Sequence, residues 1–498
     1  MPADTVVDVR QDLSILRDRR FVLLLLARTS SVLGSAFGPV ALAFGVLALP
    51  GSTATTLSIV TAAEALAMVL FVLLGGVIAD RFPRFRIMIA SDVLAAIGWG
   101  AIAVMLITGW APLWFLVFAA AFAGMATALF WPAFTGAVPE VIAEERLQTA
   151  NGFLRLGMNV ARIGGFAVAG GAVALLGAGW AMAVNSVLLL ASAGFVAALR
   201  MPARVGKPSD ASMLRDLKEG WHEFRSRQWL WVVVVQYSVI LMLLQAVWGV
   251  LGPVVANERL GGSTGWSWVL AGEAVGMLVG VFFAIRAKPK RPIRLVVLLT
   301  FPLASIPLAL GLGAPLPVAV LAAFVGGIAL DILVVMWETT MQREIPKEAL
   351  SRVSSYDALG SLMLMPIGLL LAGPSVDWIG VDAALFITAG VTVVASIAAL
   401  CSPGVRNLEW SAPTPQQTDA EQTDSERPDT EQPDTEQPDT THAVPVASAE
   451  GGGSARAGGS RTVEPARSSV GRGQLESSQP SQAAPNPAAS VPATLIEA

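Results

Sequence analysis

Histidine and cysteine are almost missing from this chain of 498 residues, and charged residues are scarce at 14%. Two histidines and a single cysteine, Cys401, exclude a His/Cys metal cluster and an intramolecular disulfide. The sequence has neither a P-loop nor a Gly-x-Ser-x-Gly motif, so we expect no ATP hydrolysis, no enzymatic activity and no cofactor. Bases lie in short loops and acids in the C-terminal tail, a balance that gives no indication of nucleic-acid binding.

Long apolar runs are abundant instead, with 54% hydrophobic residues and a mean hydropathy of +0.63. About 20 apolar residues cross a bilayer as one helix. The runs lack the alternation of a membrane β-barrel, so an all-α membrane protein is predicted. Twelve spans are expected at 21–49, 54–79, 87–109, 112–138, 149–176, 179–199, 229–256, 266–285, 293–313, 315–341, 354–376 and 382–401.

Basic residues are concentrated in every second connection between the spans. The set that begins with 50–53 contains Arg259 as its only base, whereas the other set begins with Arg81, Arg84 and Arg86. The positive-inside rule then predicts that both termini lie in the cytoplasm. We expect a multi-pass protein of the bacterial inner (plasma) membrane. The polar residues 1–20 precede an apolar run too long for a signal peptide, so this run is expected to stay as the first membrane helix.

The longest internal connection, 200–228, divides the spans into two bundles of six helices, 21–199 and 229–401. Its second half has Leu214, Leu217, Trp221 and Phe224 at helical spacing, which predicts an amphipathic helix on the inner membrane surface.

The two bundles look related in sequence. The stretch 140–147 before the fifth span resembles 344–350 before the eleventh, and this alignment places Gly164 opposite Gly368. Parallel repeats of this kind are a transporter plan with a site between the halves near mid-membrane. Residues 402–498 are rich in Pro, Asp, Thr, Gly and Ser, so we expect a disordered cytoplasmic tail.

The loop between the second and third spans reads Gly76-x-x-x-Asp80-Arg81-x-x-Arg84. It resembles the signature loop of the major facilitator superfamily, and the stretch 130–133, Phe-Trp-Pro-Ala, is similar to an enterobactin-exporter-like subgroup of siderophore and macrolide exporters. The resemblance covers residues 15–402 and implies alternating access of two pseudo-symmetric bundles. It also implies that Asp80 docks on the start of the eleventh helix, where the helix dipole favours a carboxylate.

The chain departs from this pattern in two places. Pro83 and Phe85 replace the glycine and the basic residue that are usual in the loop. The fifth span has the pair Gly164-Gly165 but lacks the Gly-Pro pair common in antiporters, which weakens the expectation of antiport more than the expectation of fold.

Charges inside the spans are the next signal, because each costs about 2.5–3.5 kcal/mol at mid-helix. They are Arg28, Glu64, Arg162, Glu273 and Asp331. Burial raises the pKa of a carboxyl group and a neighbouring arginine lowers it, so a balanced group can carry a coupled proton. Glu64 and Asp331, one in each half, are the leading candidates, with Arg28 and Arg162 as counter-charges. The alternative is a set of static ion pairs.

Aromatic and amide side chains mark a candidate substrate cavity. Gln245 and Trp248 share a helix face of the seventh span. Tyr237 lies earlier in the same span, and Trp131 lies in the fourth span. The alternative is that these aromatics only pack or lie at the membrane interfaces.

The function that these patterns favour is secondary active efflux of a small amphipathic molecule. The expected substrate is an antibiotic, a siderophore or another secondary metabolite, so a drug-resistance antiporter is one form of this prediction. The expected partners are the substrate, protons and the lipid bilayer, and the chain is expected to be a monomer. An uptake carrier of the same fold and a transport-inactive membrane receptor remain as alternatives.

Overall fold

The computed structural model describes residues 14–142, 146–201, 221–287 and 289–409, except for the side chains of 73–77, 79–81, 131, 136, 148, 347, 348 and 351. In this part of the chain every regular element is a helix. Twelve helices are long and apolar enough to cross a membrane, which confirms the predicted all-α plan. The tail after Glu409 and most of the predicted amphipathic helix lie outside the described residues.

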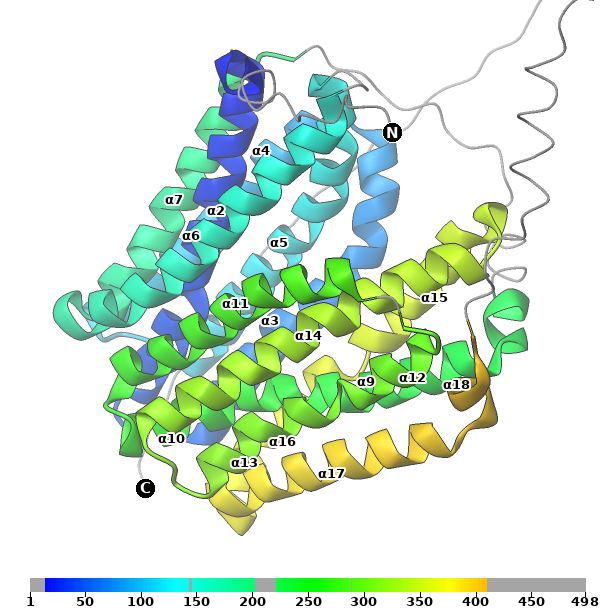
Figure 1. The fold of residues 1–498 in the computed structure, drawn as a ribbon. Coiled ribbons are helices and arrows are strands. Elements are labelled where there is room, and N and C mark those ends of the chain that lie inside the picture. The colour runs from blue at the N-terminus through cyan, green and yellow to red at the C-terminus, as the bar shows by residue number, and fades with distance from the viewer. Residues whose placement is uncertain (1–13, 143–145, 202–220, 288, 410–498) are drawn as a thin grey trace, which may run out of the picture. The chain divides into compact units, whose positions relative to one another are not determined.

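The first six spans form the N-half (Figure 1). Its elements are η1 (Ser14–Arg17), α2 (Arg19–Leu47), α3 (Ala54–Arg81), α4 (Arg84–Thr108), α5 (Leu113–Val141), α6 (Leu147–Leu176) and α7 (Ala178–Ala198). Polar caps fix two of the helix starts. Asp18 accepts a hydrogen bond from the backbone N–H of Arg20 at 2.8 Å, and Thr53 forms a capping box with Thr56.

The C-half has more interrupted helices than the N-half. Its elements are α9 (Gln228–Ala246), η3 (Val247–Leu251), α10 (Gly252–Arg259), α11 (Gly262–Arg286), α12 (Pro292–Leu298), η4 (Phe301–Ala304), α13 (Ser305–Gly311), α14 (Leu316–Glu344), α15 (Lys347–Leu362), α16 (Met365–Ile379), α17 (Val381–Cys401) and α18 (Pro403–Asn407). The interruptions fall next to Pro253, Pro302 and Pro366. Proline lacks an N–H and its ring clashes with the preceding turn, so each break has a local cause.

The last three helices of the N-half recur in the C-half at a constant interval along the chain. Helices α5 and α14 both have 29 residues and follow Pro112 and Pro315. Helices α7 and α17 both have 21 residues and follow Gly177 and Gly380, whose φ angles are +89° and +82°. Glycine suits these left-handed turns because it has no Cβ. The predicted pseudo-symmetry of the two bundles is therefore confirmed.

The interval corrects one detail of the repeat, because Gly165 rather than Gly164 corresponds to Gly368. A Cβ at Gly165 would meet Ala36 and the carbonyl oxygen of Leu33 on α2, and one at Gly368 would meet the carbonyl oxygen of Met242 on α9. A Cβ at Gly164 would meet open space. The helix rotates by about 100° per residue, so only one glycine of the pair can face its neighbour.

This difference predicts opposite outcomes for two adjacent substitutions. We expect Gly165→Leu to lower the apparent melting temperature of the purified protein, because overpacking of about 1–3 kcal/mol has no room to relax against a backbone. Tryptophan fluorescence in detergent measures this. Gly164→Leu is the matched control and should melt like the wild type. Equal melting of all three proteins would contradict the close contact of α6 with α2.

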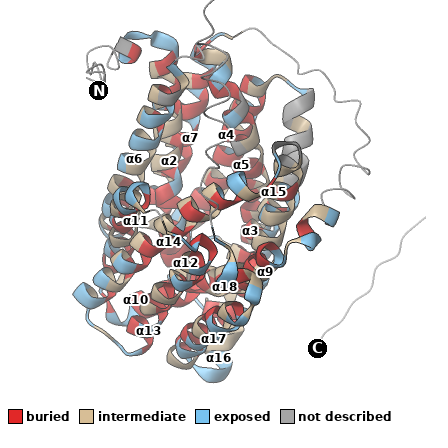
Figure 2. Ribbon diagram, turned by 45° about the vertical axis from the view of Figure 1, so that its right-hand side comes forward, coloured by how far each residue is buried: buried red, intermediate tan, exposed pale blue. Residues whose placement is uncertain are grey.

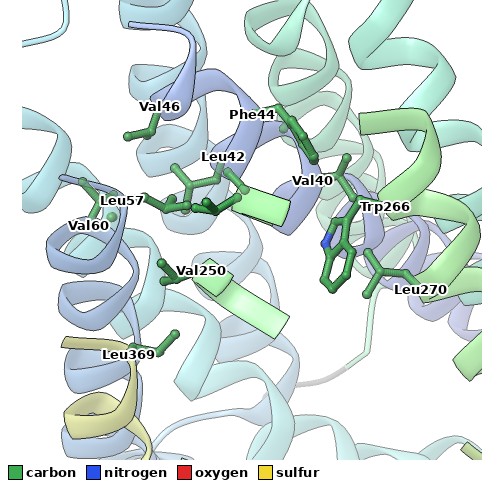
Figure 3. Packing of buried hydrophobic residues seen from close by; sticks show 14 of the residues in the cluster. Val40, Leu42, Phe44, Val46, Leu57, Val60, Val250, Trp266, Leu270 and Leu369 are labelled. Atoms are coloured by element: carbon green, nitrogen blue, oxygen red, sulfur yellow. The ribbon is translucent and has the colours of Figure 1, made fainter. Parts of the chain in front are cut away.

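Among the described residues, the buried side chains form one core that both halves share, one core in the N-half and two cores in the C-half. The shared cluster joins α2 and α3 to η3, α11 and α16, through side chains such as Leu57, Val250 and Leu369 (Figure 3). Large apolar side chains such as Phe118 and Val394 remain exposed on the outside of the helices (Figure 2). An apolar surface of this kind suits contact with lipid hydrocarbon.

Candidate functional site

The halves meet along two seams, α3 against α16 and α6 against α11. We call the end of the helices that holds Thr53, Gly177 and Gly380 the outer end, after the charge pattern that predicts its orientation, and the opposite end the inner end. One group of hydrogen bonds that join the halves lies near the outer end. Thr55 Oγ1 donates to Asp377 Oδ2 at 2.6 Å on the first seam.

Each seam is closed by a glycine of one half against a serine-bearing helix of the other. The N–H of Gly373 donates to Ser58 Oγ, and Ser263 Oγ donates to the carbonyl oxygen of Gly170 at 3.1 Å. A Cβ at Gly170 would also collide with Ser267. Gly170 and Gly373 occupy the same place in the repeat, so one contact is used twice to close the outer end.

At the inner end the apolar cores of the halves are separate. One cluster, with Phe21 and Phe134, contains N-half residues alone, and the other, with Trp229 and Met336, contains C-half residues alone. Among the described residues, the core that joins both halves thus belongs to the outer part. The structure therefore has its outer end closed.

A cavity of about 260 Å³ lies in the N-half and contains two arginines, Arg28 and Arg162. The guanidinium of Arg28 lies over the rings of Phe130 and Phe134, at 5.3 and 5.0 Å from their centroids. Asp92 also lines the cavity, is 2% exposed and interacts electrostatically with Arg28. The positive charge of Arg28 is therefore balanced within the protein, by cation–π contacts and by the carboxylate of Asp92.

Asp92 lies near the inner end of its span in the sequence, yet its side chain is buried. It accepts a hydrogen bond from Ser192 Oγ on α7 and is buried. The neighbouring Ser91 donates to the carbonyl oxygen of Ala126 at 2.6 Å. A buried charge needs such partners, which places Asp92 in the structured interior of the N-half.

Arg162 connects the two halves in the middle of the helices. It donates a hydrogen bond to the sulfur of Met277 on α11, and it interacts electrostatically with Glu273 on α11 and Asp331 on α14. Asp331 Oδ2 is buried and has no hydrogen-bond partner among the described residues. We call Arg162, Glu273 and Asp331 the inter-half charge cluster. The structure thus brings together three of the five predicted intramembrane charges.

Glu64 and Glu273 occupy equivalent positions in the repeat. The segment 62–68 reads Ala-Ala-Glu-Ala-Leu-Ala-Met, and 271–277 reads Ala-Gly-Glu-Ala-Val-Gly-Met. A Cβ at Gly124 would collide with the carbonyl oxygen of Glu64, and one at Gly327 with that of Glu273. The equivalent of Glu64 is therefore Glu273 rather than Asp331. No ion pair involves Glu64 in the part of the chain that is described.

A second cavity, of about 360 Å³, lies in the C-half. Its wall includes Gln236, Tyr237, Trp337, Glu338 and Asp357. Trp337 Nε1 donates to Asp357 Oδ2 at 3.2 Å. Sequence reasoning missed Asp357 because it lies in a polar stretch near the start of a span, where its direction depends on the rotation of α15. We call this space the C-half cavity and the one around Arg28 the N-half cavity.

A model of the transmembrane secretion effector family matches residues 11–431. The chain belongs to this family. The predicted resemblance to a transporter of the major facilitator type is thereby confirmed, and the chain is a multi-pass bacterial membrane transporter.

Two of the relatives of this chain in sequence are exporters by name. Macrolide efflux protein A of Streptococcus pyogenes is 24% identical over 345 residues, which cover 66% of this chain and 81% of the relative. The multidrug efflux pump Tap of Mycobacterium tuberculosis is 28% identical over 410 residues, which cover 78% of this chain and 94% of the relative.

Solved structures confirm the fold alone. The nucleoside transporter NupG aligns with a TM-score of 0.61 at 14% identity and covers 79% of this chain and 100% of its own. A bacterial homologue of the lysosomal transporter Spinster, solved inward-facing, aligns with a TM-score of 0.60 at 15% identity and covers 80% of this chain and 99% of its own.

The signature loop of this chain, residues 76–84, is described only in part. The side chains of Gly76, Asp80 and Arg81 lie outside the described residues, so the docking of Asp80 on the eleventh span remains a prediction. Arg84 forms an ion pair with Glu140 of α5 at 3.0 Å, within the N-half. This contact joins the start of α4 to the inner end of α5.

The predicted substrate residues lie in different places. Tyr237 lines the C-half cavity. Gln245 donates to the sulfur of Met365 at 2.9 Å, and Trp248 packs against Trp266 with ring centroids 5.6 Å apart. The side chain of Trp131 lies outside the described residues. A substrate role for Tyr237, Gln245, Trp248 and Trp131 therefore stays a prediction.

Proposed function

We propose that this protein exports an amphipathic small molecule in exchange for protons. The inter-half charge cluster is the observation that supports this function best, because a carboxylate between two moving halves can exchange its partner as the halves move. In this structure, whose outer end is closed, Arg162 of α6 interacts with Glu273 and Asp331 across the seam. When the seam opens outward, this arrangement must change, and a proton can replace the arginine on the carboxylate.

The names of the relatives support the direction of transport and the substrate class. They are a macrolide efflux protein and a multidrug efflux pump. We propose that this chain likewise moves antibiotics or related secondary metabolites outward. We also propose a monomer in the plasma membrane with both termini in the cytoplasm, without enzymatic activity and without a nucleic-acid partner. Alternating access supplies the mechanism, with glycine-mediated seams closing the outer end in one state.

The sign of an imposed pH gradient tests the proposal in proteoliposomes. With an acid interior, an antiporter should accumulate radiolabelled erythromycin or ethidium inside the vesicles as protons leave. A proton symporter, which is the uptake alternative, would instead expel the same compounds. A receptor without transport would leave both distributions unchanged. Accumulation that collapses on adding nigericin is the expected result.

Controls separate transport from passive trapping of a weak base. Liposomes without protein receive the same gradient, and their uptake is subtracted. Glu258→Gln, an acid at the outer end whose side chain is 54% exposed, is a matched charge-neutralising variant and should behave like the wild type. Gradient-driven uptake no greater than in empty liposomes, for every compound tested, would overturn the proposed function.

A further inference from the structure

The C-half cavity differs from the N-half cavity at the positions that hold charge. The intervals of the repeat place Leu33 opposite Met242, since both carbonyl oxygens face the equivalent glycines of α6 and α16. Counting back from this pair, Arg28 corresponds to Tyr237. The guanidinium of Arg28, which lies over two phenylalanine rings in the N-half, is therefore replaced in the C-half by the neutral phenol of Tyr237.

One of the two aromatic rings beside Arg28 has an aromatic equivalent in the C-half. The interval between α5 and α14 carries Phe134 onto Trp337, and Trp337 lines the C-half cavity. Phe134 lies 5.0 Å from the Arg28 guanidinium. Indole presents the best ring face for a cation, so the C-half retains a cation-binding surface and lacks the internal cation of the N-half.

A carboxylate is added where the N-half has an apolar side chain. Gly157 and Gly360 occupy equivalent positions, against Leu25 of α2 and Val234 of α9. Three residues before each lie Leu154, which is 2% exposed, and Asp357, which lines the cavity. Among the ion pairs between described side chains, none involves Asp357.

An acceptor without a partner completes the wall. Gln236 is 5% exposed and lines the same cavity. Its amide nitrogen donates to Thr300 at 3.0 Å and also reaches Ser396, whereas Oε1 has no hydrogen-bond partner within the described part of the protein. Buried polar atoms are normally satisfied, so the unpaired oxygen of a residue that lines the cavity leaves an acceptor for the positive charge or N–H donor of a ligand.

We propose that the C-half cavity binds the positively charged group of an amphipathic organic cation, with Asp357 as its counter-ion, Trp337 as its stacking surface and Gln236 as an acceptor. The volume of about 360 Å³ lies within the range of ligand pockets. This assignment names a substrate class for the export function proposed above and rests on that function, but its test measures binding alone.

Two probes of the same shape and opposite charge test the site. Tetraphenylphosphonium is a cation and tetraphenylborate is an anion, and both carry four phenyl groups. Isothermal calorimetry on the full-length protein in detergent should show tighter binding of the cation. Asp357→Asn should weaken cation binding by about tenfold or more, which corresponds to about 1.4 kcal/mol, and should leave binding of the borate unchanged.

Further variants keep the test decisive if Asp357→Asn is poorly folded, which size-exclusion chromatography reports. Asp357→Glu retains the charge and should recover most of the affinity. Trp337→Leu removes the stacking surface and should weaken phosphonium binding by about threefold to tenfold, a range typical of a partly desolvated cation–π contact. Glu258→Gln, at the outer end, should bind like the wild type.

The outcomes separate this site from the proposed function. Equal affinity for the two probes, no binding of the phosphonium to the wild type, or unchanged phosphonium affinity in both Asp357→Asn and Trp337→Leu would overturn the site, even if proteoliposomes export neutral compounds against the gradient. Asp357-dependent binding in a protein that moves no compound in proteoliposomes would support the site and overturn the export function instead.

Discussion

Replacing Glu273 by glutamine will abolish the proton-driven accumulation of substrate in proteoliposomes, with a loss of at least about tenfold in initial rate. Glutamine keeps the size and hydrogen-bonding capacity of the side chain, but it cannot bind or release a proton. Glu273 interacts with Arg162 across the seam of α6 and α11, where the halves must separate. The measurement is uptake under an acid interior, compared with substrate exchange in the absence of any pH gradient.

Exchange without a gradient is the internal control for Glu273→Gln, because it needs binding and movement of the halves but no net proton transfer. We expect exchange to survive while accumulation is lost. Glu64→Gln should likewise lose accumulation and keep exchange. Glu64 occupies the equivalent place in the N-half and packs on Gly124 as Glu273 packs on Gly327. Accumulation at the wild-type rate in Glu273→Gln would make that residue a static partner of Arg162.

The membrane fold could be predicted from the sequence because lipid imposes a minimum length and apolarity on each span. The first span was predicted at 21–49 and forms a helix at Arg19–Leu47. The twelfth was predicted at 382–401 and forms a helix at Val381–Cys401. These limits act on composition alone, so no knowledge of packing is needed to find them.

The site could be predicted only in part, because a linear sequence does not give the rotation of each helix. Arg162, Glu273 and Asp331 were found from their cost in lipid, and the structure places them together. Asp92 and Asp357 lie near span ends in the sequence, where water is an equally good explanation. Their role became visible only when neighbouring helices supplied Ser192 and Trp337.

The repeat carries more information about the site than either half alone. In both halves a glutamate, Glu64 or Glu273, has its carbonyl oxygen against a glycine of the neighbouring helix. A feature that both halves share in this way serves the fold or the transport cycle of both. Where they differ, as Arg28 differs from Tyr237, the difference marks the function of one cavity. Comparing the halves therefore substitutes for part of what comparison among homologues would show.

Substituting Gly170 by valine will reduce transport to below about a tenth of the wild-type rate, by preventing closure of the outer end. A Cβ at Gly170 would collide with the carbonyl oxygen of Ser263 and the side chain of Ser267, and the first contact cannot yield locally because it belongs to the backbone of α11. The halves must then separate at the outer end, so the population shifts toward an outward-open state. Gly373→Val, on the second seam, should act in the same way.

The adjacent Gly171 supplies a matched control for Gly170→Val, because a Cβ there would meet open space. Gly171→Val should transport at the wild-type rate and express equally well. Spin labels on Ser52→Cys and Glu258→Cys, in a protein whose exposed Cys401 is replaced by alanine, report the separation of the halves at the outer end. The distance should increase in Gly170→Val and stay unchanged in Gly171→Val. Loss of transport in Gly170→Val without a longer distance would show that the glycine contact does not control closure.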